Sequence, residues 1–151
     1  MDKAYSPKSF EETVYLSWEK EGCFSPKKEE GKDPFCVILP LPNANGDLHL
    51  GHAMFTIEDI MIRYHRMKGD VTLWQPGFDH AGFETQYVFE KFLAKQGKSR
   101  FDYSRDELYA AIWDFAQSNR GNMESQLRRM GFSLDWPRLK FPLDPAIINI
   151  V

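Results

Sequence analysis

A short apolar run, followed by turn residues and a helical repeat, limits the fold more than any other feature. Residues 35–39 read Phe-Cys-Val-Ile-Leu between two prolines, a pattern typical of a buried strand in a parallel sheet. The turn sequence PNANGD fills residues 42–47, and a helical repeat carried by Ile57, Ile60, Met61 and Tyr64 runs from residue 52 to Gly69. Residues 71–74 resemble a second strand. The segment therefore predicts a β-α-β unit with parallel strands and a right-handed crossover.

Helical patterns flank this unit on both sides. Residues 10–20 predict a short amphipathic helix closed by Gly22. Residues 82–96 and 106–130 predict two longer helices, each followed by a glycine that can act as a C-cap. Parallel strands with flanking helices define an α/β chain.

Composition and charge exclude several classes of protein. The 151 residues include 12 Phe, 6 Tyr and 4 Trp beside 10 Gly and 9 Pro, which excludes a collagen-like or disordered chain. A net charge of −3 excludes a polybasic nucleic-acid binder. Cys23 and Cys36 are too far apart for a Cys-x-x-Cys site, and neither a secretory signal nor an apolar span of about 20 residues is visible. We expect a cytoplasmic protein with no membrane partner.

The densest cluster of candidate functional residues, NGDLHLGH over residues 45–52, lies between the first strand and the helix. Ligands of α/β sheets bind at the carboxyl ends of the strands, where a helix N-terminus offers N–H donors to a phosphate. His49 and His52 share one face if the helix begins near Leu48, so both could grip one anion. Gly51 leaves room for a flat base. The alternative is a surface loop whose histidines only cap the helix.

A second cluster follows the second strand, over residues 74–82. Because parallel strands end at the same edge, Asp79 should lie near His49 and His52, where its carboxylate would suit an ammonium group. Alternatively, Asp79 is the N-cap of the next helix. Three histidines and an aspartate also permit a metal hydrolase, although no carboxylate base stands beside the histidines as in HExxH.

The basic helix end at residues 63–68 has two interpretations. It predicts solvated side chains, His65 among them, with contact to RNA phosphates as the alternative.

Longer strings resemble the class I aminoacyl-tRNA synthetases. HLGH at residues 49–52 resembles their HIGH element, and the strings PNANGDLHLGHA, DIMIRYHRMKG, TLWQPGFDHAGFETQ and RRMGFSLDWPR resemble the valyl members. The Gly-x-Asp-His-Ala-Gly form at residues 77–82 points to valine, whereas isoleucyl and leucyl members share the first string only in part. The resemblance covers nearly residues 1–143.

The resemblance implies the first half of a Rossmann-like catalytic domain at residues 35–143, preceded by a helix and connector at 1–34 and followed by a truncated tail at 144–151. It implies valine–tRNA ligase activity, with ATP and magnesium as cofactors and valine and tRNA(Val) as partners. Its implied catalytic residues are His49 and His52. The implied ATP-binding residues are Asn45, Gly46, His49, Gly51, which makes room for adenine, and His52. The implied amino-acid-binding residues are Pro40, Leu41, Trp74 and Asp79, of which Asp79 pairs with the amino group. No metal ligand is implied.

Several features depart from the family pattern. Leu41 replaces a usual proline, and Phe78 and Phe83 stand where smaller or aliphatic residues are common. The second family signature, Lys-Met-Ser-Lys-Ser, is absent, and the chain ends on an apolar run. We therefore expect a truncated or split polypeptide that is inactive or weakly active alone and that a complementary synthetase chain could complete. The alternatives are a non-catalytic nucleotide- or partner-binding module and an isoleucine- or leucine-type synthetase fragment.

Overall fold

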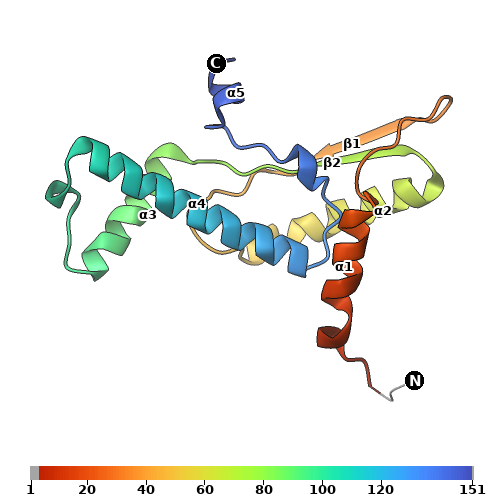
Figure 1. Ribbon diagram of the computed structural model, residues 1–151, viewed down its shortest axis with the longest axis horizontal. Helices are drawn as coiled ribbons and strands as arrows, with labels where there is room; N and C mark the ends of the chain where they lie inside the picture. The colour runs from red at the N-terminus through yellow and green to blue at the C-terminus, as the bar shows by residue number, and fades with distance from the viewer. Residues whose placement is uncertain (1–3, 151) are drawn as a thin grey trace. The chain divides into compact units, whose positions relative to one another are not determined.

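The computed structural model describes residues 4–150 (Figure 1). These residues divide into two compact units. Unit 1 comprises the described part of residues 1–39 together with residues 54–76 and 127–138. Unit 2 comprises residues 40–53, 77–126 and the described part of residues 139–151. Each unit is described by itself.

Unit 1 is built on a two-stranded parallel sheet. Strand β1 (Pro34–Ile38) pairs with β2 (Val71–Gln75), and helix α2 (Met54–Lys68) connects them in the chain. The register places Phe35 opposite Thr72 and Val37 opposite Trp74. Helix α1 (Glu11–Lys20) precedes the sheet in the sequence. The predicted β-α-β unit with parallel strands is confirmed.

The prediction that β1 is a fully buried strand is wrong. Its residues alternate between exposed and half-buried, and Ile38 is 68% exposed. Phe35 stacks on His65 of α2 with ring centroids 3.5 Å apart, so one face of the strand is covered by the helix. Cys36 and Ile38 alternate with Phe35 along the strand, and both are exposed on its other face.

Helix α2 forms where the repeat predicts it, but other residues face the sheet. Its buried side chains are Phe55, Asp59 and Ile62. The repeat residues Ile57 and Tyr64 are more than half exposed on the outer face. Apolar residues recur at helical spacing on both the inner and the outer face of α2. The sequence pattern alone therefore did not show which face packs against the sheet.

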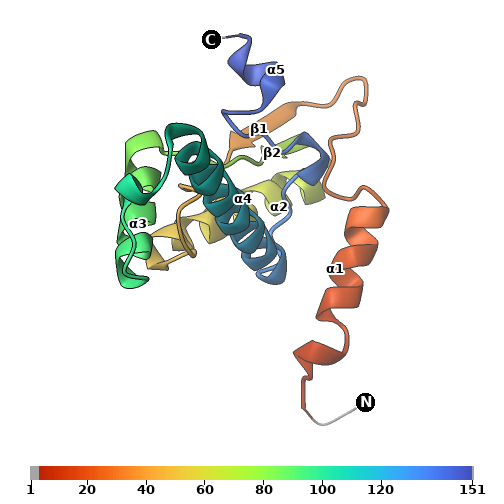
Figure 2. The same ribbon diagram turned by 60° about the vertical axis from the view of Figure 1, so that its left-hand side comes forward.

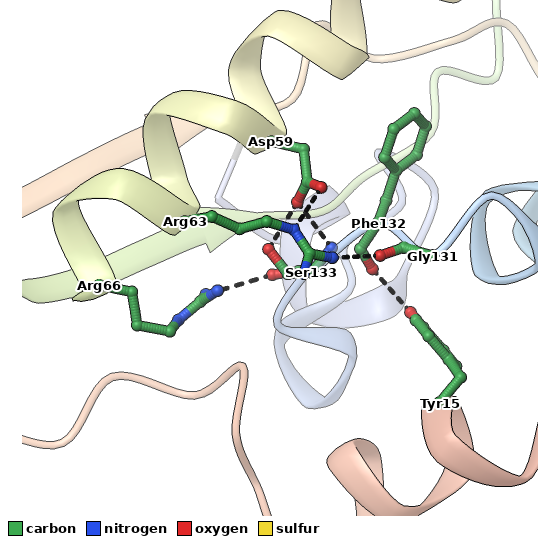
Figure 3. A network of polar contacts seen from close by, with 7 residues as sticks. All are labelled: Tyr15, Asp59, Arg63, Arg66, Gly131, Phe132 and Ser133. Atoms are coloured by element: carbon green, nitrogen blue, oxygen red, sulfur yellow. Dashed lines mark hydrogen bonds and ion pairs between the residues drawn. The ribbon is translucent and has the colours of Figure 1, made fainter. Parts of the chain in front are cut away.

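A buried polar network joins α2 to the segment at residues 131–133 (Figure 3). The Asp59 carboxylate accepts hydrogen bonds from the Ser133 backbone N–H at 3.0 Å, the Ser133 hydroxyl at 2.6 Å and Arg63 Nε at 2.6 Å. Arg63 also donates to the carbonyl oxygen of Gly131, and Arg66 donates to that of Ser133 at 3.4 Å. Arg63 and Arg66 thus bind backbone carbonyl oxygens inside unit 1. The prediction that this basic helix end is solvated is wrong for these two residues.

The side chain of His65 is also not simply solvated. Its ring stacks on Phe35, and its Nδ1 atom lies 2.6 Å from a carboxylate oxygen of Asp70. The hydrogen bond from His65 lowers the pKa of Asp70 below its ordinary value. His65 therefore connects the end of α2 to β1 and to Asp70, the residue directly before β2.

Within unit 1, Tyr15 joins helix α1 to the segment at residues 132–136. Its hydroxyl donates to the carbonyl oxygen of Phe132 at 2.7 Å (Figure 3). The same hydroxyl accepts from Trp136 Nε1 at 2.8 Å. Burial raises the pKa of Tyr15 to about 12. Tyr15 is therefore neutral at physiological pH, and its hydroxyl both donates and accepts a hydrogen bond.

Unit 2 contains α3 (Gly82–Lys95), most of α4 (Arg105–Arg129) and the short α5 (Pro145–Ile148). Helices α3 and α4 lie side by side in both views (Figures 1 and 2), with the rings of Phe89 and Phe115 5.4 Å apart between them. Gly131 follows α4 with a φ of +78°, the left-handed conformation that the predicted glycine stop requires. Among residues 4–150, no helix has the length and apolar character needed to cross a membrane.

Candidate functional site

The two candidate catalytic histidines lie against each other in unit 2. His52 belongs to a 3-10 turn (Leu50–Ala53) that leads into α2, which places it at the helix start as predicted. The ring centroids of His49 and His52 are 4.2 Å apart. The two rings are therefore adjacent, but the expected helix start near Leu48 is wrong, because the 3-10 turn begins at Leu50 and His49 precedes it.

Backbone hydrogen bonds determine which ring nitrogen carries the proton in each neutral imidazole. The His49 N–H donates to Nδ1 of His52 at 3.0 Å, and the Gly51 N–H donates to Nδ1 of His49 at 3.0 Å. A neutral imidazole that accepts at Nδ1 carries its proton on Nε2. In its neutral form each ring therefore carries its N–H on Nε2.

Gly51 makes room for one of these rings. A Cβ atom at residue 51 would lie 2.8 Å from Cε1 and 3.0 Å from Nδ1 of His49. The missing side chain thus lets the His49 ring fold back over the turn. The role implied for Gly51, space for adenine, stays a prediction.

Burial lowers the pKa of His52 below its ordinary value of 6.5, and the neighbouring His49 lowers it further through charge repulsion. With a lowered folded-state pKa, the stabilisation from neutral His52 is complete above pH 6.5 and is lost as the pH falls toward the folded-state pKa. We expect His49→Ala to raise the pKa of His52, because the charge of His49 disappears while the backbone N–H remains. Titration of the histidine C2 proton signals by NMR measures this. A His52 pKa that is unchanged in the variant would contradict the coupling.

The backbone brings the loop of Asp79 beside the turn sequence that precedes the histidines. The Ala44 N–H donates to the carbonyl oxygen of Asp79 at 2.8 Å, and the Asp79 N–H donates to that of Pro42 at 2.9 Å. Both loops belong to unit 2. These contacts place Asp79 beside residues 42–44 of the turn, and its proximity to His49 and His52 stays a prediction.

Asp79 does not cap the following helix. Helix α3 starts at Gly82 with Ala81 as its N-cap residue, and no side chain caps it. The Asp79 carboxylate instead accepts from the Ala81 N–H at 3.1 Å, inside the loop. Its side chain is 42% exposed, so the carboxylate remains accessible to a cationic group.

A strained backbone follows Asp79. Ala81 has a φ of +51°, a left-handed conformation that costs a residue with a side chain about 1–2 kcal/mol. The Thr85 hydroxyl donates to the carbonyl oxygen of His80 at 2.7 Å and holds this turn in place. Such strain is often found at functional sites, and the sequence around an alanine gave no signal for it.

The remaining candidate residues divide between the units. Unit 2 holds all but one of them, namely Pro40, Leu41, Asn45, Gly46, His49, Gly51, His52 and Asp79. The exception, Trp74, is fully buried in unit 1 and donates from Nε1 to Glu58 at 3.2 Å. Leu41 packs on Gly77, where a Cβ atom would lie 2.5 Å from its Cδ2. The pocket-wall roles of Pro40, Leu41 and Trp74 stay predictions.

Two side chains of α4 contact the turn, and sequence analysis did not single them out. Asn122 and Gln126 both donate to Oδ1 of Asp47, the latter at 3.0 Å, and Gln126 also accepts from the Leu48 N–H at 2.9 Å. The contacts join residues more than 70 positions apart, so no local pattern could reveal them.

Comparison with known proteins identifies the family. The family described as tRNA synthetases class I (I, L, M and V) matches residues 13–151. This chain belongs to that family. It is 47% identical over 153 residues to a valine–tRNA ligase of Treponema denticola, spanning all of this chain and 17% of the relative.

A solved class I synthetase has the same fold. The structure is a LeuRS of Agrobacterium radiobacter K84 in a ternary complex with tRNA and LeuAMS. It matches with a TM-score of 0.78 at 20% identity, over 96% of this chain and 17% of the LeuRS chain. The likeness supports the predicted Rossmann-like α/β fold.

The sequence analysis assigned no metal ligand in this chain and left a metal hydrolase as an alternative. Among residues 4–150, no three His, Cys, Asp or Glu side chains gather as ligands of one metal ion. The three histidines and the aspartate of the two loops therefore do not form a recognisable metal centre in the described part of the chain.

Proposed function

We propose that this chain forms the phosphate-binding part of a valine–tRNA ligase active site. The observation that carries the proposal is the pair of adjacent imidazoles of His49 and His52, whose ring centroids are 4.2 Å apart and whose Nδ1 atoms both accept from backbone N–H groups. In the proposed first step, the carboxylate of valine attacks the α-phosphorus of ATP and pyrophosphate leaves. In the second step, the terminal ribose hydroxyl of tRNA(Val) attacks the carbonyl carbon of the adenylate and AMP leaves.

The histidines would act on the phosphates by charge stabilisation. Phosphoryl-type transfer needs positioning and neutralisation of charge more than covalent chemistry from the protein. Two N–H donors on adjacent rings suit the oxygens of a phosphate chain whose negative charge shifts toward the leaving pyrophosphate. Asn45 and Gly46 would shape the turn before them. The Asn45 N–H donates to the carbonyl oxygen of Asn43 at 2.8 Å, which supports that role.

Asp79 would bind the ammonium group of valine. Its exposed carboxylate is held by the Ala81 N–H and lies on the loop that pairs with the turn sequence. Pro40 and Leu41 would line the pocket for the valine side chain. The 47% identity to a valine–tRNA ligase supports valine over leucine or isoleucine.

Magnesium is proposed on the family resemblance alone. Mg²⁺ commonly binds substrate phosphates together with one or two carboxylates. No cluster of three candidate ligands lies within residues 4–150, so we assign it no ligand in this chain and derive no step through it.

The chain spans 17% of the length of the valine–tRNA ligase that it matches. The activity, valine, tRNA(Val) and a complementary synthetase chain are therefore proposed for the whole enzyme. Because the proposed substrate is tRNA, we propose the cytoplasm as its location.

A hybrid enzyme tests the proposal. In it, this chain replaces the segment of the Treponema denticola valine–tRNA ligase with which it aligns. The hybrid is expected to exchange pyrophosphate into ATP when valine is present. Exchange that instead depends on leucine or isoleucine would favour those synthetases. An inactive hybrid whose chain still binds ATP would favour a non-catalytic nucleotide-binding module.

The isolated chain is expected to catalyse little or no valine-dependent pyrophosphate exchange. Only the histidine-bearing signature is present, and groups that act as a unit lose nearly all their effect when part of the unit is removed. The same exchange assay on the 151-residue chain measures this. A turnover in the ordinary enzyme range of about 1 to 1,000 per second would show that this part suffices.

A further inference from the structure

Two amide side chains of α4 hold the turn that presents the paired histidines. Asn122 and Gln126 are four residues apart and so lie on one face of the helix. Both donate to the same carboxylate oxygen of Asp47. The amide oxygen of Gln126 also accepts from the Leu48 N–H at 2.9 Å.

The amide of Gln126 fixes two successive residues of the loop. It uses its donor on the side chain of Asp47 and its acceptor on the backbone of Leu48, the residue directly before His49. Residues 44–49 contain no helix or strand that could fix the loop through a regular backbone pattern. The contacts with α4 therefore help to set the position of His49 along the turn.

The contacts with α4 also hold the negatively charged carboxylate of Asp47 in one place. Asp47 lies two residues before His49, so a freely rotating carboxylate would repel a phosphate bound by the histidines. Two N–H donors on α4 hold this carboxylate against the helix surface. Hydrogen bonds from donors to an ionised acceptor are among the stronger ones.

We propose that Asn122 and Gln126 are positioning residues for phosphate binding by His49 and His52. They act through Asp47 and Leu48 and do not touch the substrate. The inference rests on the proposed function, because the phosphate is the one assigned there to ATP.

The test uses the complete 151-residue chain and two measurements. The first is the dissociation constant for ATP. The second is the set of ¹⁵N chemical shifts of the His49 and His52 rings, which report their Nδ1 hydrogen bonds without any ligand. Gln126→Ala is expected to weaken ATP binding by about tenfold and to shift the His49 signals, because the loop loses both contacts. Gln126→Glu should weaken binding more, because it places a second carboxylate beside Asp47.

A matched control comes from the same helix. Asn119 donates from its side-chain amide to the carbonyl oxygen of Phe115 inside α4. Asn119→Ala removes an amide of the same kind and is expected to leave ATP binding and the histidine signals unchanged. Asn122→Ala, which removes one exposed donor, serves as the second variant if Gln126→Ala unfolds; it should give a smaller change in the same direction.

A rescue experiment separates positioning from general loss of structure. Adding Asp47→Asn to Gln126→Ala removes the freed charge and should recover part of the ATP affinity. Equal ATP binding and unchanged histidine signals in both Gln126 variants would overturn the inference. If the wild-type chain does not bind ATP but Gln126→Ala still shifts the His49 signals, the positioning contact holds and the proposed function fails.

Discussion

Replacing His49 or His52 with alanine is expected to lower valine-dependent pyrophosphate exchange in the hybrid enzyme by about 100-fold or more. Each substitution removes one Nε2 donor from developing phosphate charge, and the loss of one such donor typically costs about 10²–10³ in rate. The double variant should lose less than the product of the single losses, because the rings adjoin each other and act together.

A histidine outside the candidate site provides the control. His65 is stacked on Phe35 and paired with Asp70, so His65→Gln should affect stability more than exchange. The assay is exchange of labelled pyrophosphate into ATP at saturating valine. Single histidine variants with nearly wild-type exchange would rule out the phosphate role.

Asp59→Ala is expected to destabilise the chain by about 3–5 kcal/mol. The carboxylate accepts from both polar hydrogens of Ser133 and from Arg63, and it is 9% exposed (Figure 3). Its removal leaves a buried N–H, a buried hydroxyl and a guanidinium without their acceptor, and each unsatisfied group costs its desolvation energy. The free energy of unfolding in urea, followed by far-UV circular dichroism, measures the loss.

Two other substitutions serve as comparisons for the stability of Asp59→Ala. Asp114→Ala removes an exposed carboxylate from α4 and should change stability by less than about 0.5 kcal/mol. Asp59→Asn keeps an acceptor oxygen for Ser133 and should fall between the two. If Asp59→Ala were as stable as Asp114→Ala, the network would have no net stabilising effect.

Local signals in the sequence predicted the elements correctly. The PNANGD turn, the repeat up to Gly69 and the glycines after α3 and α4 act through backbone geometry over a few residues, so they can be interpreted without tertiary structure. The HLGH motif and the longer strings indicated the class I synthetase family, which the match over residues 13–151 then established.

Burial was harder to predict than secondary structure. The apolar run of β1 suggested a strand covered on both faces, and the outer repeat of α2 gave no indication of which face packs. Burial depends on which surfaces meet, and hydrophobicity along one segment contains no information about its partner. His65 and Arg63 appeared to be solvated for the same reason, since Asp70, Gly131 and Phe35 come close only in the fold.

The sequence by itself determined the α/β class, the strand, turn and helix order, and the histidine pair at the start of a helix. These depend on residue spacing and turn chemistry, which are local properties of the chain. Only the tertiary structure decided that Asp79 pairs with the turn through its backbone and that α4 holds Asp47. Hydrogen bonds need donor and acceptor within about 3 Å, and packing alone brings residues distant in sequence that close.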